Sequence, residues 1–81
     1  MFSGEMKQMA GKLPAVKAKR VVRALERAGF YVHHIKGGHY FLRKDSANII
    51  IPYHNKDLKP GTLHDIVKKS GLTVDEFIAL L

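Results

Sequence analysis

The chain has 81 residues and a formal net charge of +7, from 14 Lys and Arg against 7 Asp and Glu, which favours a polyanionic partner such as nucleic acid or an acidic protein. Its length fits one small domain, its hydrophobic fraction of 46% excludes a disordered chain, and the lack of cysteine excludes a disulfide scaffold or thiolate metal site. No apolar run approaches the roughly 18 residues needed to span a bilayer, so we expect a cytoplasmic protein without a membrane segment.

The N-terminal part of the chain divides into a tail and a helix. Residues 1–12 lack the apolar core of a secretory signal, so we expect a flexible extension followed by one domain over residues 13–81. Apolar residues recur at three- and four-residue spacing over Pro14–Ala28 and predict a helix that begins with its proline. Gly29 suits the position after the last turn, onto which Phe30 folds back. The opposite side carries basic residues that either grip phosphates or form a solvated face, namely Lys19, Arg20, Arg23 and Arg27.

Three short strands are predicted next. They are Phe30–Lys36, His39–Lys44 and Asn48–Pro52, and the first two flank a Gly37-Gly38 turn in which both positions tolerate positive φ. Period-two alternation sends one set of side chains toward the helices, namely Phe30, Val32, Tyr40, Leu42, Ile49 and Ile51. The set expected on the open face is His39, Phe41, Arg43 and Ile50. The adjacent histidines His33 and His34 are expected to face opposite ways.

Two helices close the chain. Pro60 opens the first and Gly71 ends it, while Thr73 and Glu76 form a capping box that starts a final helix to about Leu80. The predicted fold is therefore α+β: a helix, a three-stranded antiparallel sheet, a helix and a short C-terminal helix, with the helices on one sheet face. This is the layout of a double-stranded-RNA-binding domain.

The most informative stretch for chemistry surrounds His39, which follows the glycine pair and has Lys36 and Arg43 on either side. Acid–base work on a phosphate needs groups that transfer protons and cations that stabilise the developing negative charge. Imidazole serves as either acid or base near neutral pH. From the residues alone, His39 is therefore either an acid–base group that acts on a phosphate or a tolerated surface histidine.

Other candidate groups are less distinctive. His54 is either a second acid–base partner on the same rim or a loop histidine that hydrogen-bonds the backbone. Gly61-Thr62 either binds a phosphate at a helix N-terminus or only satisfies local amides, and His64 is expected to face solvent. No histidine pair has carboxylate support at ligand spacing, so we expect neither a metal nor a small-molecule cofactor.

The order of several short motifs resembles that of the HicA (YcfA-like) toxins of HicA–HicB toxin–antitoxin systems. The resemblance runs from about Leu13 to Leu81, and its motifs are Leu25 with Gly29-Phe30, Lys36-Gly37-Gly38-His39, Ile51-Pro52-Tyr53-His54, Lys59-Pro60-Gly61-Thr62-Leu63 with Ile66, and Leu72-Thr73-Val74-Asp75-Glu76-Phe77. The resemblance implies a double-stranded-RNA-binding-like fold, metal-independent cleavage of mRNA and inhibition by a HicB antitoxin.

The resemblance also implies that His39 is the catalytic residue. The usual turn motif of the family is Gly-Ser-His, and Gly38 here replaces the serine, which removes a hydroxyl and is expected to loosen the turn. We predict that the residues around the histidine contact RNA, namely Lys36, Gly37, Gly38, Arg43, Lys44 and His54.

Three functions remain open from the sequence. The first is an endoribonuclease toxin that cuts mRNA with His39 and is silenced by an acidic HicB-type antitoxin. The second is a non-catalytic RNA-binding module of the same fold, whose basic residues contact A-form RNA. The third is a basic adaptor for an acidic protein. Charge and fold suit the first two equally, whereas a histidine after a glycine pair is needed only by the enzyme.

Overall fold

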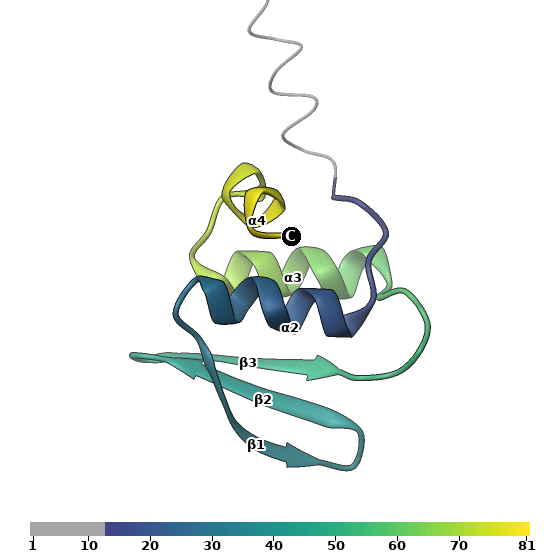
Figure 1. Ribbon diagram of the computed structural model, residues 1–81, viewed down its shortest axis with the longest axis vertical. Helices are drawn as coiled ribbons and strands as arrows, with labels where there is room; N and C mark the ends of the chain where they lie inside the picture. The colour runs from purple at the N-terminus through teal and green to yellow at the C-terminus, as the bar shows by residue number, and fades with distance from the viewer. Residues whose placement is uncertain (1–12) are drawn as a thin grey trace, which may run out of the picture.

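The computed structural model describes residues 13–81, and the extension predicted for residues 1–12 lies outside them. The described part contains α2 (Ala18–Arg27), β1 (Tyr31–Lys36), β2 (His39–Lys44), β3 (Ala47–Pro52), α3 (Pro60–Ser70) and α4 (Val74–Leu80). The strands form an antiparallel sheet in the order β1-β2-β3. In Figure 1 the helices lie on one side of this sheet, and its other face is uncovered. The predicted α+β fold is confirmed.

The hydrophobic core lies between the sheet and the helices. Its members come from every described element except β1, and include Leu25 of α2, Leu42 of β2 and Phe77 of α4, none of which has any exposed surface. The predicted inward set is also confirmed: Phe30, Leu42, Ile49 and Ile51 are buried, and Val32 and Tyr40 are partly buried against the core. No helix within residues 13–81 has the length and apolar character needed to cross a membrane.

The start predicted for the first helix is wrong. α2 begins at Ala18 rather than at Pro14, because the chain just before it is tied in extended form to the segment that precedes α3. The carbonyl of Val16 accepts a hydrogen bond from the Leu58 amide at 2.9 Å, and Lys17 forms an isolated antiparallel bridge with Asp57.

The end of α2 follows the prediction. Gly29 has a φ of +103°, and the Phe30 amide donates to the Leu25 carbonyl at 2.9 Å. This bond, with that from the Gly29 amide to the Glu26 carbonyl at 3.0 Å, is the Schellman pattern that closes a helix C-terminus.

The remaining helix boundaries are also confirmed. Pro60 lies in the first turn of α3, and Gly71 ends that helix with a φ of +80°. At the start of α4, the Thr73 hydroxyl accepts from the Glu76 amide at 3.1 Å, and the Glu76 carboxylate accepts from the Thr73 amide at 2.8 Å. This capping box fixes where α4 begins, and so where Phe77 enters the core.

The two histidines of β1 do not alternate as predicted. Val32 pairs with Leu42 and His34 pairs with Phe41, so the register shifts by one residue and β1 contains a bulge. Both histidine rings lie against Phe41, with ring centroids 6.4 Å away for His33 and 5.3 Å away for His34. The bulge therefore brings both imidazoles to the open face.

Two tight turns connect the strands. Gly37 and Gly38 have φ of +56° and +77°, the pair of positive values that a type I′ hairpin turn requires. β3 begins at Ala47, one residue before the predicted start, because the second turn has only two residues. The first of these, Asp45, has a φ of +52°.

Candidate active site

His39 is the first residue of β2 and is exposed at the rim of the sheet. Its Nδ1 lies 3.2 Å from the carbonyl oxygen of Gly37. A carbonyl oxygen only accepts hydrogen bonds, so this contact requires the proton on Nδ1 and leaves Nε2 as the free nitrogen of the neutral ring. The turn thus holds the imidazole in the tautomer that can take a proton through Nε2.

The turn beneath His39 is anchored to the end of β3. The Tyr53 amide donates to the Gly38 carbonyl at 2.8 Å, so the turn is fixed on the side away from β1. This bond uses the backbone of Gly38, so it does not depend on which side chain stands at this position. A Cβ added at Gly38 would meet only the Tyr53 oxygen, at 4.0 Å, so the φ of +77° rather than lack of space favours glycine here.

The cations predicted to surround His39 lie at different distances from it. Lys36 is directly opposite His39 in the β1–β2 ladder, on the same face of the sheet. Arg43 is on that face too, but four residues along β2, or about 13 Å away along the strand. Its Nε donates to the Asn48 Oδ1 at 3.0 Å. Lys36 is therefore close enough to contact a phosphate bound at His39. Arg43 can contact only a more distant part of an extended ligand.

Lys44 points to the helix side of the sheet, away from His39. Its Nζ donates to the Ala28 carbonyl at 2.6 Å and lies 5.9 Å from the centre of the Phe30 ring. A cation at this position caps the C-terminus of α2, where free carbonyls and the helix dipole favour positive charge. This geometry gives Lys44 a structural partner and does not bring it to the His39 rim.

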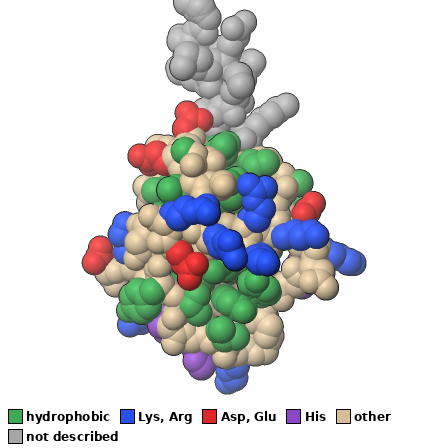
Figure 2. All heavy atoms as spheres, in the orientation of Figure 1, with side chains coloured by type: hydrophobic (Ala, Val, Ile, Leu, Met, Phe, Trp, Pro, Cys, Tyr) green, Lys and Arg blue, Asp and Glu red, His purple; other side chains and the backbone are tan. Residues whose placement is uncertain are grey.

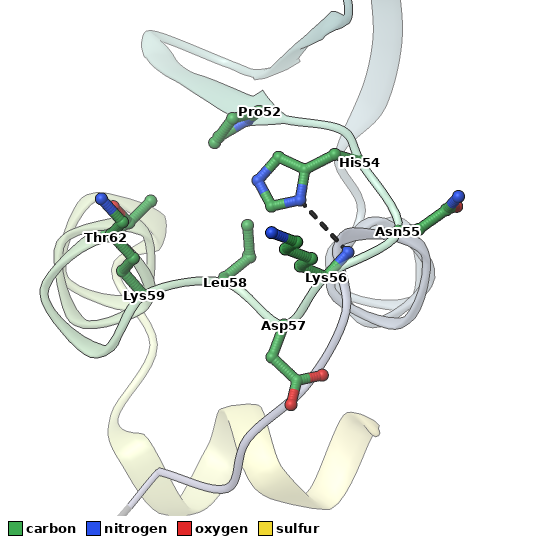
Figure 3. A pocket seen from close by; sticks show the side chains of 8 residues that line it. All are labelled: Pro52, His54, Asn55, Lys56, Asp57, Leu58, Lys59 and Thr62. Atoms are coloured by element: carbon green, nitrogen blue, oxygen red, sulfur yellow. Dashed lines mark hydrogen bonds between the residues drawn. The ribbon is translucent and has the colours of Figure 1, made fainter.

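His54 points into an open cavity of about 630 Å³ between the end of β3 and the start of α3 (Figure 3). Its Nδ1 accepts a hydrogen bond from the Lys56 amide at 3.3 Å, as the loop-histidine interpretation requires. In Figure 3 the carboxylate of Asp57 points away from this ring. The cavity is also lined by Lys56, Lys59 and Thr62, and it adjoins Pro52, the cross-strand neighbour of His39.

The first turn of α3 borders the same cavity. No side chain caps this helix, and no acidic residue lies in its first turn. Thr62 is partly buried in the cavity wall, while Gly61 is exposed. His64 is exposed on α3, as predicted. Within residues 13–81, no group of three or more His, Asp or Glu side chains is arranged to hold a metal ion.

The sequence analysis missed part of the open face. Tyr31 is 53% exposed, and its ring lies edge-on to that of His33 with centroids 6.4 Å apart. A signal for the bulge was present, because Val32 and Ile35 are three residues apart and a regular strand alternates every two. Both belong to the helix side, where they pair with Leu42 and Tyr40.

The sequence comparison decides the family. A family model described as HicA toxin of bacterial toxin–antitoxin matches residues 18–72, which is more than half of the chain. The chain belongs to the HicA toxin family. No curated protein matches it. The HicA match spans α2, the whole sheet and α3, and so includes the turn that carries His39, whereas α4 lies outside it.

The surface of this HicA-family chain carries a band of basic side chains next to exposed apolar area (Figure 2). In Figure 2, Lys and Arg side chains form a band over the helices, and hydrophobic side chains reach the surface below them, over the sheet. The predicted basic side of α2 contributes to the charge, since its members are all exposed: Lys19, Arg20, Arg23 and Arg27. The large hydrophobic residues exposed in the described chain are all on the sheet: Tyr31, Ile35 and Ile50.

Proposed function

We propose that this toxin is an endoribonuclease that cuts mRNA without a metal ion, with His39 as general acid or base. The observation that carries the proposal is the hydrogen bond from His39 Nδ1 to the Gly37 carbonyl. It leaves Nε2 of an exposed imidazole free at the sheet rim, opposite a lysine. Membership of the HicA family supports a toxin role.

The chemistry follows from these positions. Nε2 of His39 accepts the proton of the oxygen that attacks the phosphorus, and the protonated ring is able to donate to the leaving 5′-oxygen. Charge builds up on the non-bridging phosphate oxygens during the attack, and the ammonium group of Lys36 is the nearest cation by strand register to stabilise it. The proposed site therefore supplies proton transfer and positive charge from adjacent strands.

The direct test is cleavage of RNA by the purified protein in excess EDTA. We expect cleavage at the same rate as without chelator, because the described residues offer no cluster of metal ligands and proton transfer needs only the imidazole. His39→Ala protein, purified in the same way, controls for contaminating ribonuclease. Loss of cleavage on chelation, with recovery in magnesium, would contradict the metal-independent mechanism.

The second prediction concerns the antitoxin. We propose that a HicB-type protein, encoded by a neighbouring gene and acidic, binds the toxin and blocks RNA cleavage. Opposite net charges accelerate such an association, and the +7 charge of the chain suits an acidic partner. We expect co-expression to restore growth and the two proteins to copurify.

Modification with diethyl pyrocarbonate tests where that partner binds. In the complex, we expect protection of His39, with exposed His64 on α3 as the internal reference in the same digest. Rescue of growth with His39 fully reactive would place the block elsewhere. If no neighbouring gene product rescues growth, the antitoxin proposal is wrong.

A non-catalytic RNA-binding module is the second candidate, favoured by the exposed basic side of α2. Such a module would bind RNA through phosphates and 2′-hydroxyls without cleaving it. The EDTA experiment separates the two, since a binder leaves RNA intact whether or not chelator is present.

A further inference from the structure

The open face of the sheet carries side chains in three cross-strand rows. Lys36, His39 and Pro52 form the row at the rim, and His34, Phe41 and Ile50 form the middle row. The last row is Tyr31, Arg43 and Asn48. Because the β1 bulge adds His33 beside Phe41, aromatic rings continue along the face from the middle row to the last.

The rings on this face are not stacked on one another. Tyr31 and His33 meet at 69°, His33 and Phe41 at 68°, and His34 and Phe41 at 56°. On the helix side, by contrast, Tyr40 and Tyr53 are stacked at 4.2 Å and 19°, so each already covers a face of the other. Because these contacts are edge-on or tilted, ring faces on the open side have no stacking partner among the residues of this cluster.

The charged side chains of the three strands are all basic. The sequences of β1, β2 and β3 contain no Asp or Glu, whereas their open face carries Lys36, Arg43 and three histidines. Aromatic rings interleaved with cations are the arrangement by which proteins hold single-stranded nucleic acid, since bases stack on the rings and phosphates meet the cations. An acidic protein partner would bury the same rings as apolar anchors, so loss of antitoxin binding is included below as an outcome of the test.

We infer that the open face of the sheet is a stacking platform for single-stranded RNA, with Tyr31, Phe41, His33 and His34 as its rings. The platform leads along β2 to His39, so it holds the nucleotides next to the cleaved bond. The inference rests on the proposed function and specifies its substrate: an unpaired strand rather than a duplex, whose bases already stack on each other. Arg43, too far from His39 to act there, contacts the backbone of the strand at the far end of the platform.

Binding is tested with a single-stranded 2′-O-methyl oligonucleotide of mixed sequence that contains 2-aminopurine. The modified strand has no free 2′-hydroxyl to attack, and gel electrophoresis after each titration checks that it has not been cut by water, so its affinity and stacking are measured on an intact ligand. We expect quenching of 2-aminopurine on binding, and weaker binding of the duplex formed with a complementary strand. Tyr31→Leu should lower the affinity by roughly 5- to 150-fold, the usual effect of removing one base–aromatic stack, and Tyr31→Phe should retain the affinity.

Ile35→Ala is the matched control. Ile35 is as exposed as Tyr31, at 55% against 53%, and comes from the same strand, but its register puts it on the helix side. Its replacement should leave affinity and quenching unchanged. Because Tyr31 is more than half exposed, Tyr31→Leu is expected to fold, and circular dichroism checks this. Phe41→Leu gives a second, independent test in the middle row.

The outcomes separate this inference from the proposed function. If Tyr31→Leu and Phe41→Leu bind the single strand as tightly as the wild type, or if the duplex binds better, the platform is wrong even where unmodified RNA is still cut. If these variants keep their RNA affinity but lose the antitoxin, the face is a protein interface and the inference is overturned. Failure of the wild type to cut unmodified RNA contradicts the proposed function alone, because binding is measured on a strand that is not cleaved.

Discussion

The variant His39→Ala is expected to lose RNA cleavage by about 10²–10⁴-fold, the usual effect of removing a general acid or base. Its fold should be unchanged, because His39 is exposed and the hydrogen bond from its side chain goes only to the adjacent turn. Growth arrest on induction should disappear together with mRNA cleavage. Rates of cleavage in vitro and mRNA integrity after induction are the measurements.

Two further variants make this test specific. His39→Asn has a side-chain amide able to donate to the Gly37 carbonyl but cannot exchange a proton with substrate, so it should be as inactive as the alanine variant. His64→Ala removes an exposed histidine from α3 and should cut RNA at the wild-type rate. Wild-type cleavage by His39→Asn would remove His39 from the chemistry. If His39→Ala unfolds while His39→Asn is folded and active, the histidine is structural.

The second large effect concerns stability. Phe77→Ala should lower the free energy of unfolding by about 3–5 kcal/mol, because Phe77 has no exposed surface and its removal leaves a cavity in the core. A native domain has only about 5–15 kcal/mol in total, so this loss is a large fraction of the stability of the protein. Urea denaturation measures the change.

The matched control is Ile78→Ala, one residue further along α4. Ile78 is partly exposed and is not part of the core cluster, so its loss should cost far less. Equal effects of the two substitutions would show that α4 contributes by its helix alone and not by inserting Phe77. Because α4 lies outside residues 18–72, this experiment also tests whether the stability of the domain depends on a residue beyond the part that the family model matches.

The features that the sequence predicted well depend on neighbouring residues. The Schellman end of α2 at Gly29 and the capping box at Thr73 each involve residues within about one turn of helix, so composition and spacing identify them. The alternation of inward and outward side chains along β2 and β3 also depends only on neighbouring residues, and Leu42 and Ile49 are buried as expected.

The features that it missed depend on distant parts of the chain. α2 begins late because Val16 is hydrogen-bonded to Leu58, more than 40 residues away in sequence. Lys44 was predicted near His39 because the two residues are close in sequence. It lies at the opposite end of β2, and its side chain donates a hydrogen bond to the Ala28 carbonyl at the end of α2. In the candidate site, the sequence is enough to place Lys36 opposite His39, because a two-residue Gly-Gly turn pairs the residues on either side of it. The tautomer of His39 could not be predicted, because it depends on the direction in which the Gly37 carbonyl points.

The bulge in β1 also changes what the edge of the sheet offers to another molecule. β1 is an edge of the sheet, and a flat edge strand offers a row of free amides and carbonyls to which another molecule can add a strand. The extra residue at His33 interrupts the regular spacing of that row and increases the local twist. The same insertion that brings a second imidazole to the open face therefore makes the β1 edge a poorer template for the addition of a strand from another molecule.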